Sequence, residues 1–256
     1  MTKIHTETFG SGKPITLVHG WAMHSGIWRA FANALAKHYQ VTLLDLPGHG
    51  SSENISPFTL ETISQTLVDA AEDERSCWLG WSLGAEIVLE IARRFPERVN
   101  RLVLLAGTPC FVKKTDWPGM DEQVLENFSA NLQQDSQMTL LRFLALQIKG
   151  LDDQKSALQN IIPLVSESPA PNQKILQEGL AILKETDLKD AFANLKIPVA
   201  VILGQLDTLI PAIIGEKMLA LLPGMDLTII DRAGHMPFLS HEDAVVKTVC
   251  DFMDQQ

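Results

Sequence analysis

A serine flanked by glycines, in the sequence GWSLG at residues 80–84, is the feature of this chain with the clearest chemical meaning. An apolar segment at 77–79 precedes it, and residues 85–94 have a helical pattern. This context predicts a sharp strand-to-helix turn, in which the glycines avoid Cβ clashes and the Ser82 hydroxyl is held out above a sheet. The pentapeptide alone also fits a plain glycine-rich turn, and the flanking elements favour a nucleophile.

A serine hydroxyl is a weak nucleophile at neutral pH, so it needs a base and a group that orients the base. Asp207 follows an apolar run over 199–204, and His235 lies in a segment after the apolar run 227–230. Alone, such an aspartate is typical of a cap or turn, and such a histidine is typical of a surface. Because they follow Ser82 in the chain order Ser, Asp, His, they predict a catalytic triad.

The sequence His19-Gly20-Trp21 ends another apolar run, ahead of the nucleophile turn. A loop at this position supplies one backbone N–H of an oxyanion hole, and the residue after the nucleophile supplies the other. We therefore expect the N–H groups of Trp21 and Leu83 to be the two donors. An ordinary turn is the alternative interpretation of His19-Gly20.

Short apolar runs, typical of strands, alternate along the chain with helical patterns, and these elements must position the candidate residues. This alternation predicts an α/β fold, with a mostly parallel central sheet and helices on both faces. The expected strands are 15–18, 40–44, 76–79, 99–106, 199–204 and 227–230, and the expected core helices include 28–36, 60–71 and 85–94.

Between residues 111 and 188 the patterns are helical, without a convincing strand. We predict a helical cap, inserted after the sixth core strand and lying over the carboxyl ends of the strands, where open α/β sheets bind ligands. Residues 1–110 and 189–256 would then form the core. The expected cap helices are 121–132, 137–147 and 172–183, separated by breaks at Pro163, Pro169 and Pro171.

Composition narrows the class of protein. With 256 residues and 46% hydrophobic residues, the chain can form one large domain, or a domain with an inserted cap. The net charge of −10 argues against nucleic acid or an anionic membrane as a partner. No N-terminal apolar core and no run of about eighteen apolar residues is found, so a cytoplasmic protein without a signal peptide or membrane span is expected.

The three cysteines, Cys77, Cys110 and Cys250, are few and widely spaced, which does not suggest a disulfide framework. No Cys and His cluster has the spacing of metal ligands, and no glycine pattern of a nucleotide site is found. We expect chemistry without a metal or cofactor.

With these residues in view, the chain resembles the α/β-hydrolase superfamily, and more closely the pimeloyl-acyl-carrier-protein methyl ester carboxylesterases of biotin synthesis. The residues that carry the resemblance are 19–21, 44–48, 78–84, 109–111, 117–119, 142–147, 179–180, 182–184 and the loops of Asp207 and His235. The segments at the cap carry the narrower identification.

The resemblance implies an α/β-hydrolase fold and hydrolysis of a methyl ester on a pimeloyl chain carried by acyl carrier protein, a transient partner. Small esters would serve as surrogate substrates, and a monomer is expected. It implies Ser82, Asp207 and His235 as the triad, Trp21 and Leu83 as oxyanion donors, and Trp21, Ser82, Leu83, Phe143 and His235 as substrate-binding residues.

The resemblance also implies basic residues on the cap that contact the acidic carrier protein. Arg142, Lys149 and Lys155 are the candidates, and Arg142 and Lys149 share a helical face if that helix reaches Lys149. Met138 and Gln159 stand where the family tends to carry further arginines. Residues 111–190 hold 8 Lys and Arg against 12 Asp and Glu, so the predicted carrier contact is weak and salt-sensitive. A solvated helix face is the alternative.

The substrate pocket is expected to be an apolar channel between core and cap, although each candidate wall also fits plain core packing. The candidate walls are Trp21, Trp81, Leu83, Phe111, Phe143, Leu146 and Leu209.

Three other functions are compatible with the same fold. A general short-chain carboxylesterase differs only at the cap. A carbon–carbon bond hydrolase uses the same triad but needs polar groups for a keto-acid, for which the sequence offers no clear candidate. A non-catalytic ligand receptor would not need a complete triad. Dehalogenase chemistry is disfavoured, because it needs a carboxylate where Ser82 stands.

Overall fold

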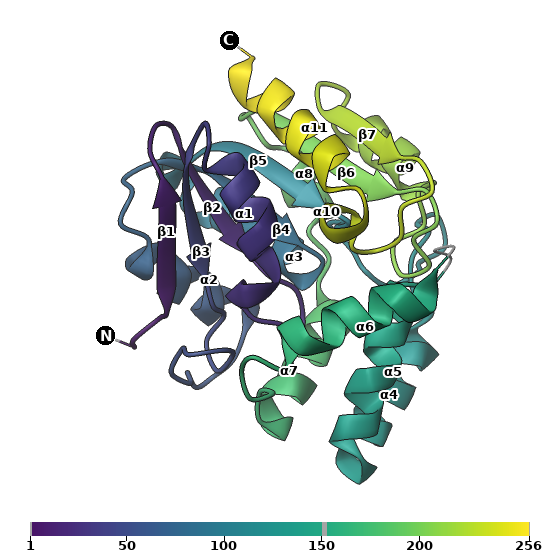
Figure 1. The fold of residues 1–256 in the computed structure, drawn as a ribbon. Helices are drawn as coiled ribbons and strands as arrows, with labels where there is room; N and C mark the ends of the chain where they lie inside the picture. The colour runs from purple at the N-terminus through teal and green to yellow at the C-terminus, as the bar shows by residue number, and fades with distance from the viewer. Residues whose placement is uncertain (1, 150–152, 256) are drawn as a thin grey trace.

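The computed structural model describes residues 2–149 and 153–255. Its described strands form one seven-stranded sheet, in the order β1-β3-β2-β4-β5-β6-β7 (Figure 1). Neighbouring strands are parallel, except that β1 is antiparallel to β3. The strands are β1 Thr6–Gly10, β2 Pro14–Val18, β3 Gln40–Leu44, β4 Ser76–Trp81, β5 Val99–Leu105, β6 Val199–Gly204 and β7 Asp226–Ile230.

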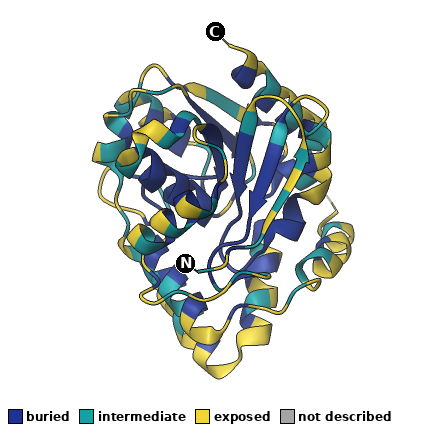
Figure 2. Ribbon diagram, turned by 90° about the vertical axis from the view of Figure 1, so that its left-hand side faces the viewer, coloured by how far each residue is buried: buried dark blue, intermediate teal, exposed yellow. Residues whose placement is uncertain are grey.

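Helices cover both faces of the sheet, as the sequence predicted. Alternate side chains of each strand point to opposite faces, so the buried residues divide into two clusters. In Figure 2 the central strands are buried, and exposed residues lie on the outer helix faces. One cluster packs under α1 Arg29–Leu35 and α11 Glu242–Asp254, and the other under α2 Leu60–Ala70, α3 Leu83–Arg94, α8 Lys189–Ala193 and α9 Ile214–Leu221.

Four helices lie between β5 and β6 in the chain, and Figure 1 shows them grouped at one end of the sheet. The residue before each helix caps it, because its side chain accepts a hydrogen bond from a backbone N–H of the first turn. The capping residues are Asp121, Asp135, Asp153 and Asn172. The helices are α4 Glu122–Gln134, α5 Ser136–Gln147, α6 Gln154–Val165 and α7 Gln173–Glu185. The division into a core and a cap of 111–188 stays a prediction, and its residues 150–152 lie outside the described chain.

Three details differ from the sequence analysis. The strand β1 was not expected, because its alternating, half-exposed residues carry a weaker pattern than the buried central strands. The helix α6 was also missed, since Pro163 was interpreted as a break. Pro163 lies in the last turn of α6, where its missing N–H removes one hydrogen bond near the end of the helix. The insertion follows the fifth strand in chain order, not the sixth.

Short elements complete the site loops. The 3₁₀ turn η1, Ser25–Trp28, follows the segment after β2, and α10, Pro237–Ser240, follows the segment after β7. A second 3₁₀ turn, η2, spans Pro96–Arg98. None of the helices in the described ranges is long and apolar enough to cross a membrane.

Candidate active site

Ser82 lies at a strained turn between β4 and α3. Its φ of 58° and ψ of −120° are uncommon for a residue with a side chain. The turn needs both glycines, because a Cβ on Gly80 would overlap the carbonyl of Gly84, and one on Gly84 would overlap the carbonyl of Val18. The Ser82 N–H donates to the carbonyl of Leu105 at 3.1 Å, which fixes the turn on the neighbouring strand.

The structure brings Ser82, His235 and Asp207 into one hydrogen-bonded chain. The Ser82 hydroxyl lies 2.9 Å from His235 Nε2, and His235 Nδ1 lies 2.7 Å from Asp207 Oδ2. A carboxylate only accepts, so Nδ1 carries the proton and Nε2 is left to accept from the Ser82 hydroxyl. All three side chains are buried. This geometry suits a hydroxyl that gives its proton to an imidazole held in one tautomer.

Backbone groups hold both partners of Ser82 in place. Asp207 Oδ1 accepts from the N–H groups of Leu209 and Ile210, at 2.8 and 3.0 Å. These two bonds leave Oδ2 for His235. The His235 carbonyl accepts from the Trp81 indole at 2.8 Å, and its N–H donates to the carbonyl of Gln147 at 3.2 Å.

The two expected oxyanion donors lie beside the nucleophile turn. Leu83 is the first residue of α3, so its N–H has no partner in its own helix. A Cβ on Gly20 would come within 3.1 Å of the Ser82 Cβ, so a glycine lets the segment before Trp21 run close to the serine. Among the described residues, the backbone N–H groups of Trp21 and Leu83 donate no hydrogen bond.

Comparison with known proteins shows the family of this chain. A model of the α/β-hydrolase fold family matches residues 13–242, which is most of the chain. The chain belongs to the α/β-hydrolase family. The esterase of Exiguobacterium antarcticum has the same fold, with a TM-score of 0.89 at 22% identity, over 99% of this chain and 96% of that one.

This α/β hydrolase has curated relatives that match it nearly end to end. One from Methylococcus capsulatus is 38% identical over 247 residues, covering 96% of this chain and 97% of its own. One from Nitrosomonas europaea is 38% identical over 247 residues, covering 96% and 98%. Both are named pimeloyl-acyl-carrier-protein methyl ester esterase. The chain therefore belongs to the narrower family that the sequence resembles.

Five of the candidate walls of this hydrolase share one buried cluster: Trp21, Leu83, Phe111, Phe143 and Leu209. The Trp21 and Phe143 rings meet edge to face, with centroids 4.7 Å apart. Leu146 is half-buried against the same cluster. Trp81 packs in the other cluster, where its ring contacts Trp28, Phe238 and His235. Trp81 therefore supports the His235 segment from the core.

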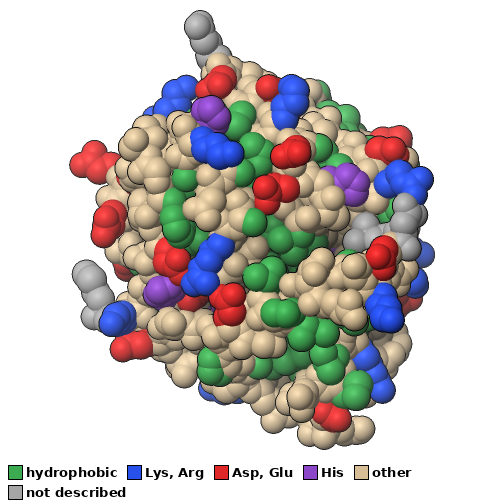
Figure 3. All heavy atoms as spheres, viewed as in Figure 1, with side chains coloured by type: hydrophobic (Ala, Val, Ile, Leu, Met, Phe, Trp, Pro, Cys, Tyr) green, Lys and Arg blue, Asp and Glu red, His purple; other side chains and the backbone are tan. Residues whose placement is uncertain are grey.

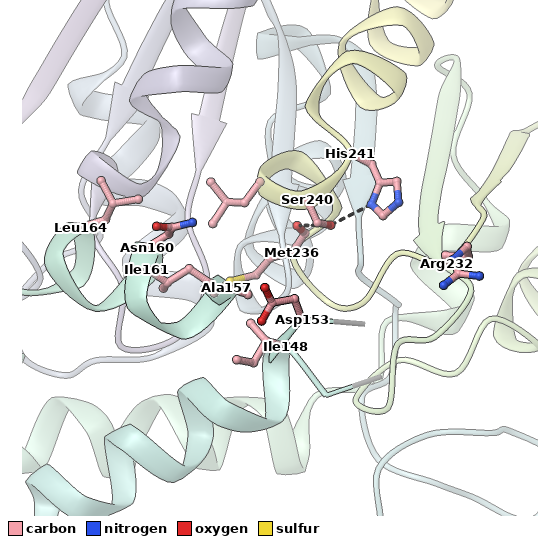
Figure 4. Close-up of a pocket in the computed structure, with 11 residues that line it drawn as sticks. Ile148, Asp153, Ala157, Asn160, Ile161, Leu164, Arg232, Met236, Ser240 and His241 are labelled. Carbon is pink, nitrogen blue, oxygen red and sulfur yellow. Dashed lines mark hydrogen bonds between the residues drawn. The ribbon is translucent and has the colours of Figure 1, made fainter. Parts of the chain in front are cut away.

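Two cavities of the hydrolase flank this region. One of about 360 Å³ lies between α5 and α6 and reaches Ala22, Met23 and Phe143. Figure 4 shows the other, of about 370 Å³, between α6 and the segment after His235, lined by apolar Ile148, Ile161 and Met236 and by polar Asp153 and His241. Ser82 lines neither. The described residues offer no cluster of three or more side chains able to hold a metal ion.

The three basic residues predicted to contact a carrier protein are exposed, but they do not share one helix. Arg142 lies on α5, Lys155 lies in the first turn of α6, and Lys149 lies in the turn after α5. Since α5 ends at Gln147, the condition for a shared helical face of Arg142 and Lys149 is not met. Figure 3 shows apolar side chains gathered over these cap helices, and Met138, Leu141 and Ile162 are exposed apolar residues of α5 and α6.

The sequence analysis missed Gln147 as a residue of interest. Its side chain is 1% exposed, and neither of its polar atoms has a hydrogen-bond partner among the described residues. Buried amides normally have partners, which a bound molecule or an ordered water supplies when the protein does not. Residues 142–147 were singled out because they resemble the family, but the burial of Gln147 beside His235 depends on the fold.

Two buried histidines, His19 and His49, form hydrogen bonds in the segments that follow β2 and β3. His19 donates from Nδ1 to the carbonyl of Gly20 and accepts at Nε2 from the Leu46 N–H. Burial lowers the pKa of His19 to about 4. His49 donates from Nδ1 to the carbonyl of Pro47, and burial, with the neighbouring His19, lowers its pKa to about 3. Both imidazoles are therefore neutral in the folded protein at neutral pH.

We expect His49→Asn to lose less stability on acidification than the wild type. The unfolded chain takes up a proton on His49 near pH 6.5, while the folded protein does so only near pH 3. The stability contributed by neutral His49 is thus complete above pH 6.5 and declines as the pH falls toward 3. Between pH 7 and pH 5 the decline amounts to about 2 kcal/mol.

Urea unfolding at the two pH values measures the gap in unfolding free energy between the wild type and His49→Asn. Burial raises the pKa of Glu86 well above its usual range, which stabilises the fold on acidification, but Glu86 is present in both proteins and cancels in the difference. A gap that is the same at pH 7 and pH 5 would contradict the neutral state of His49.

Proposed function

We propose that this chain is a serine esterase that hydrolyses the methyl ester of pimeloyl-acyl carrier protein, in biotin synthesis. The products are methanol and the free pimeloyl carboxylate on the carrier. The observation that carries the proposal is the Ser82–His235–Asp207 geometry in a chain that is 38% identical to relatives named for this ester. The proposed roles are Ser82 as nucleophile, His235 as base and Asp207 as the group that orients it.

In the proposed first step, the Ser82 oxygen attacks the ester carbonyl carbon while His235 Nε2 takes the hydroxyl proton. The carbonyl oxygen becomes negative and accepts hydrogen bonds from the Trp21 and Leu83 N–H groups. Losing one such donor typically costs about 2.7–4 kcal/mol of transition-state stabilisation. Asp207 stabilises the imidazolium that forms.

In the second half, the imidazolium gives its proton to the leaving methoxide oxygen, and methanol departs. An acyl ester on Ser82 remains. His235 then takes a proton from water, whose oxygen attacks the same carbonyl carbon, and returns it to Ser82 as the acyl chain leaves as a carboxylic acid. Each proton passes through Nε2, which explains why the tautomer fixed by Asp207 matters.

The cavity between α5 and α6 is the proposed path of the acyl chain and its carrier arm. Its volume of about 360 Å³ is in the range of small-molecule sites. It is lined by Phe143, one of the proposed substrate contacts, and by Ala22 and Met23, which follow Trp21 in the chain. Arg142, Lys149 and Lys155 are the proposed contacts of the acidic carrier protein, at the exposed surface of the same cap.

The test is a hydrolysis assay on pimeloyl-acyl-carrier-protein methyl ester beside a short-chain aryl ester. We expect kcat/KM to be higher for the carrier-linked ester by at least about tenfold, and we expect that advantage to shrink as salt screens the basic cap residues. Arg142→Ala should reduce the advantage, while Lys174→Ala, which removes a cation of α7 paired with Glu178, should not.

A general carboxylesterase without a carrier protein is the second candidate. The exposed apolar side chains of Leu141 and Ile162 favour it, because they border the cavity between α5 and α6 where a carrier-specific surface would present charge. Equal or better activity on the aryl ester at every salt concentration would leave the triad chemistry in place and overturn the carrier-linked substrate.

A further inference from the structure

A cap helix contacts both residues whose backbone is proposed to bind the oxyanion. The indole of Trp21 lies against α7, and its Nε1 donates to the carbonyl of Leu176 at 2.9 Å. A Cβ added to Gly179 would lie 2.7 Å from Trp21 Cδ1, 2.9 Å from Trp21 Nε1 and 3.9 Å from Leu83 Cδ2. The side chains of both donor residues therefore meet the helix at Gly179.

Gly179 and Leu176 together hold the indole: Gly179 leaves room for the ring, and the Leu176 carbonyl accepts its hydrogen bond. They are three residues apart and lie on the same face of α7, so the helix presents a notch beside a carbonyl acceptor. A glycine inside a helix is destabilising relative to alanine. Real Cβ atoms do not approach a ring atom at 2.7 Å, and a buried indole has little room to move away. The close approach of Trp21 thus accounts for the glycine.

The position of the indole is tied to the position of the Trp21 N–H. Trp21 is 1% exposed and is held between α7 and the edge of the Phe143 ring. Ala22, the next residue, has a positive φ of 59°, so the backbone makes a defined turn directly after Trp21. A ring displaced from α7 must shift the backbone that carries it, and an oxyanion donor works only at its correct position.

We propose that Gly179 is a positioning residue for the oxyanion hole, through which the cap sets the position of the Trp21 N–H. This inference rests on the proposed esterase function and adds that the cap contributes to the chemical step as well as to substrate choice. Gly179 touches neither substrate nor reacting atoms in this account. Its effect passes entirely through Trp21.

The first test is Gly179→Ala, measured on an ester that the wild type hydrolyses. We expect kcat to fall about 10–100-fold with KM within about threefold, because the change alters the transition state more than substrate binding. The affinity for a boronic acid, which forms a negatively charged tetrahedral adduct with the serine, should fall by the same factor as kcat/KM. Purely structural damage to α7 would not link these two quantities.

Gly215→Ala is the matched control. Gly215 also lies in a helix, α9, and a Cβ there would come within 2.8 Å of a neighbouring side chain, the flexible end of Leu227. The Gly215→Ala substitution adds the same methyl group at a similarly tight contact that does not involve Trp21. We expect its kcat to stay within about twofold of the wild type.

A double-mutant cycle with Trp21→Ala tests whether the effect passes through the indole. Without the ring, the added methyl of Gly179→Ala has nothing to displace, so it should change kcat/KM by less than about twofold in that background. Equal losses in both backgrounds, or an unchanged kcat in Gly179→Ala alone, would overturn the inference while the esterase function stands. A wild-type protein that hydrolyses neither ester and is not labelled at Ser82 by a fluorophosphonate would overturn both.

Discussion

Replacing Ser82 with alanine is expected to lower kcat/KM for any ester substrate by about 10⁴-fold or more. Without the hydroxyl, His235 has no nucleophile to activate, and no acyl ester can form. Losses of this order are typical when the nucleophile of a serine hydrolase is removed, and the remaining rate comes from the oxyanion donors and substrate binding. Steady-state kinetics and loss of fluorophosphonate labelling measure the effect.

The fold should survive this change. Among the described residues, Ser82 Oγ makes one hydrogen bond, to His235 Nε2, and alanine fits the same turn because its side chain is smaller. We expect the free energy of unfolding to stay within about 1 kcal/mol of the wild type. Ser129→Ala on α4 is the matched control, and it should keep full activity. A Ser82→Ala protein with a tenth or more of wild-type kcat/KM would overturn the assignment of the nucleophile.

Asp207→Asn is expected to lower kcat by about 10³–10⁴-fold with little change in structure. The Leu209 and Ile210 N–H groups both donate to Oδ1, so the new amide keeps its oxygen there and turns its NH₂ toward His235. His235 Nδ1 must then accept, which moves the ring proton to Nε2. A protonated Nε2 cannot take the proton of Ser82, and this tautomer change is known to disable triads of this type.

Kinetics of Asp207→Asn beside Asp231→Asn measure this effect. Asp231 is exposed in the segment before His235, so its amide variant removes one nearby negative charge without touching the triad, and it should retain activity. Asp207→Ala should lose stability as well, because the two backbone donors then have no acceptor. If Asp207→Asn kept kcat within tenfold of the wild type, Asp207 would not be the residue that orients His235.

Much of the fold was predictable because its strongest signals are local. The strand β6 is a continuous apolar run that ends in a glycine, and β3 is mostly apolar, and each is followed by a turn that the sequence marks. The weaker pattern of β1 was not recognised, because an edge strand with exposed residues resembles a loop. In α6, Pro163 was interpreted as a break, but the helix continues for two residues beyond it and ends at Val165.

The residues of the candidate site were predictable for a related reason. The carboxyl ends of parallel strands meet at one edge of a sheet, so polar residues that follow β4, β6 and β7 converge without detailed knowledge of the packing. The glycines around Ser82 were recognisable as a short sequence pattern, although the carbonyl that excludes a Cβ at Gly84 belongs to Val18 of the strand β2.

Family membership, the alternation of most core strands and helices along the chain, and a candidate triad were therefore predictable, because they depend on neighbouring residues and on strand ends. The contacts that form across long separations became known only from the folded chain. The Ser82–His235 bond joins residues 153 positions apart, and the Trp21–Leu176 bond joins residues 155 apart. The burial of Gln147 and the contact of Gly179 with Trp21 likewise depend on how α5 and α7 pack against the rest of the chain. No periodicity along the chain encodes such contacts, because they depend on the relative positions of separately folded segments.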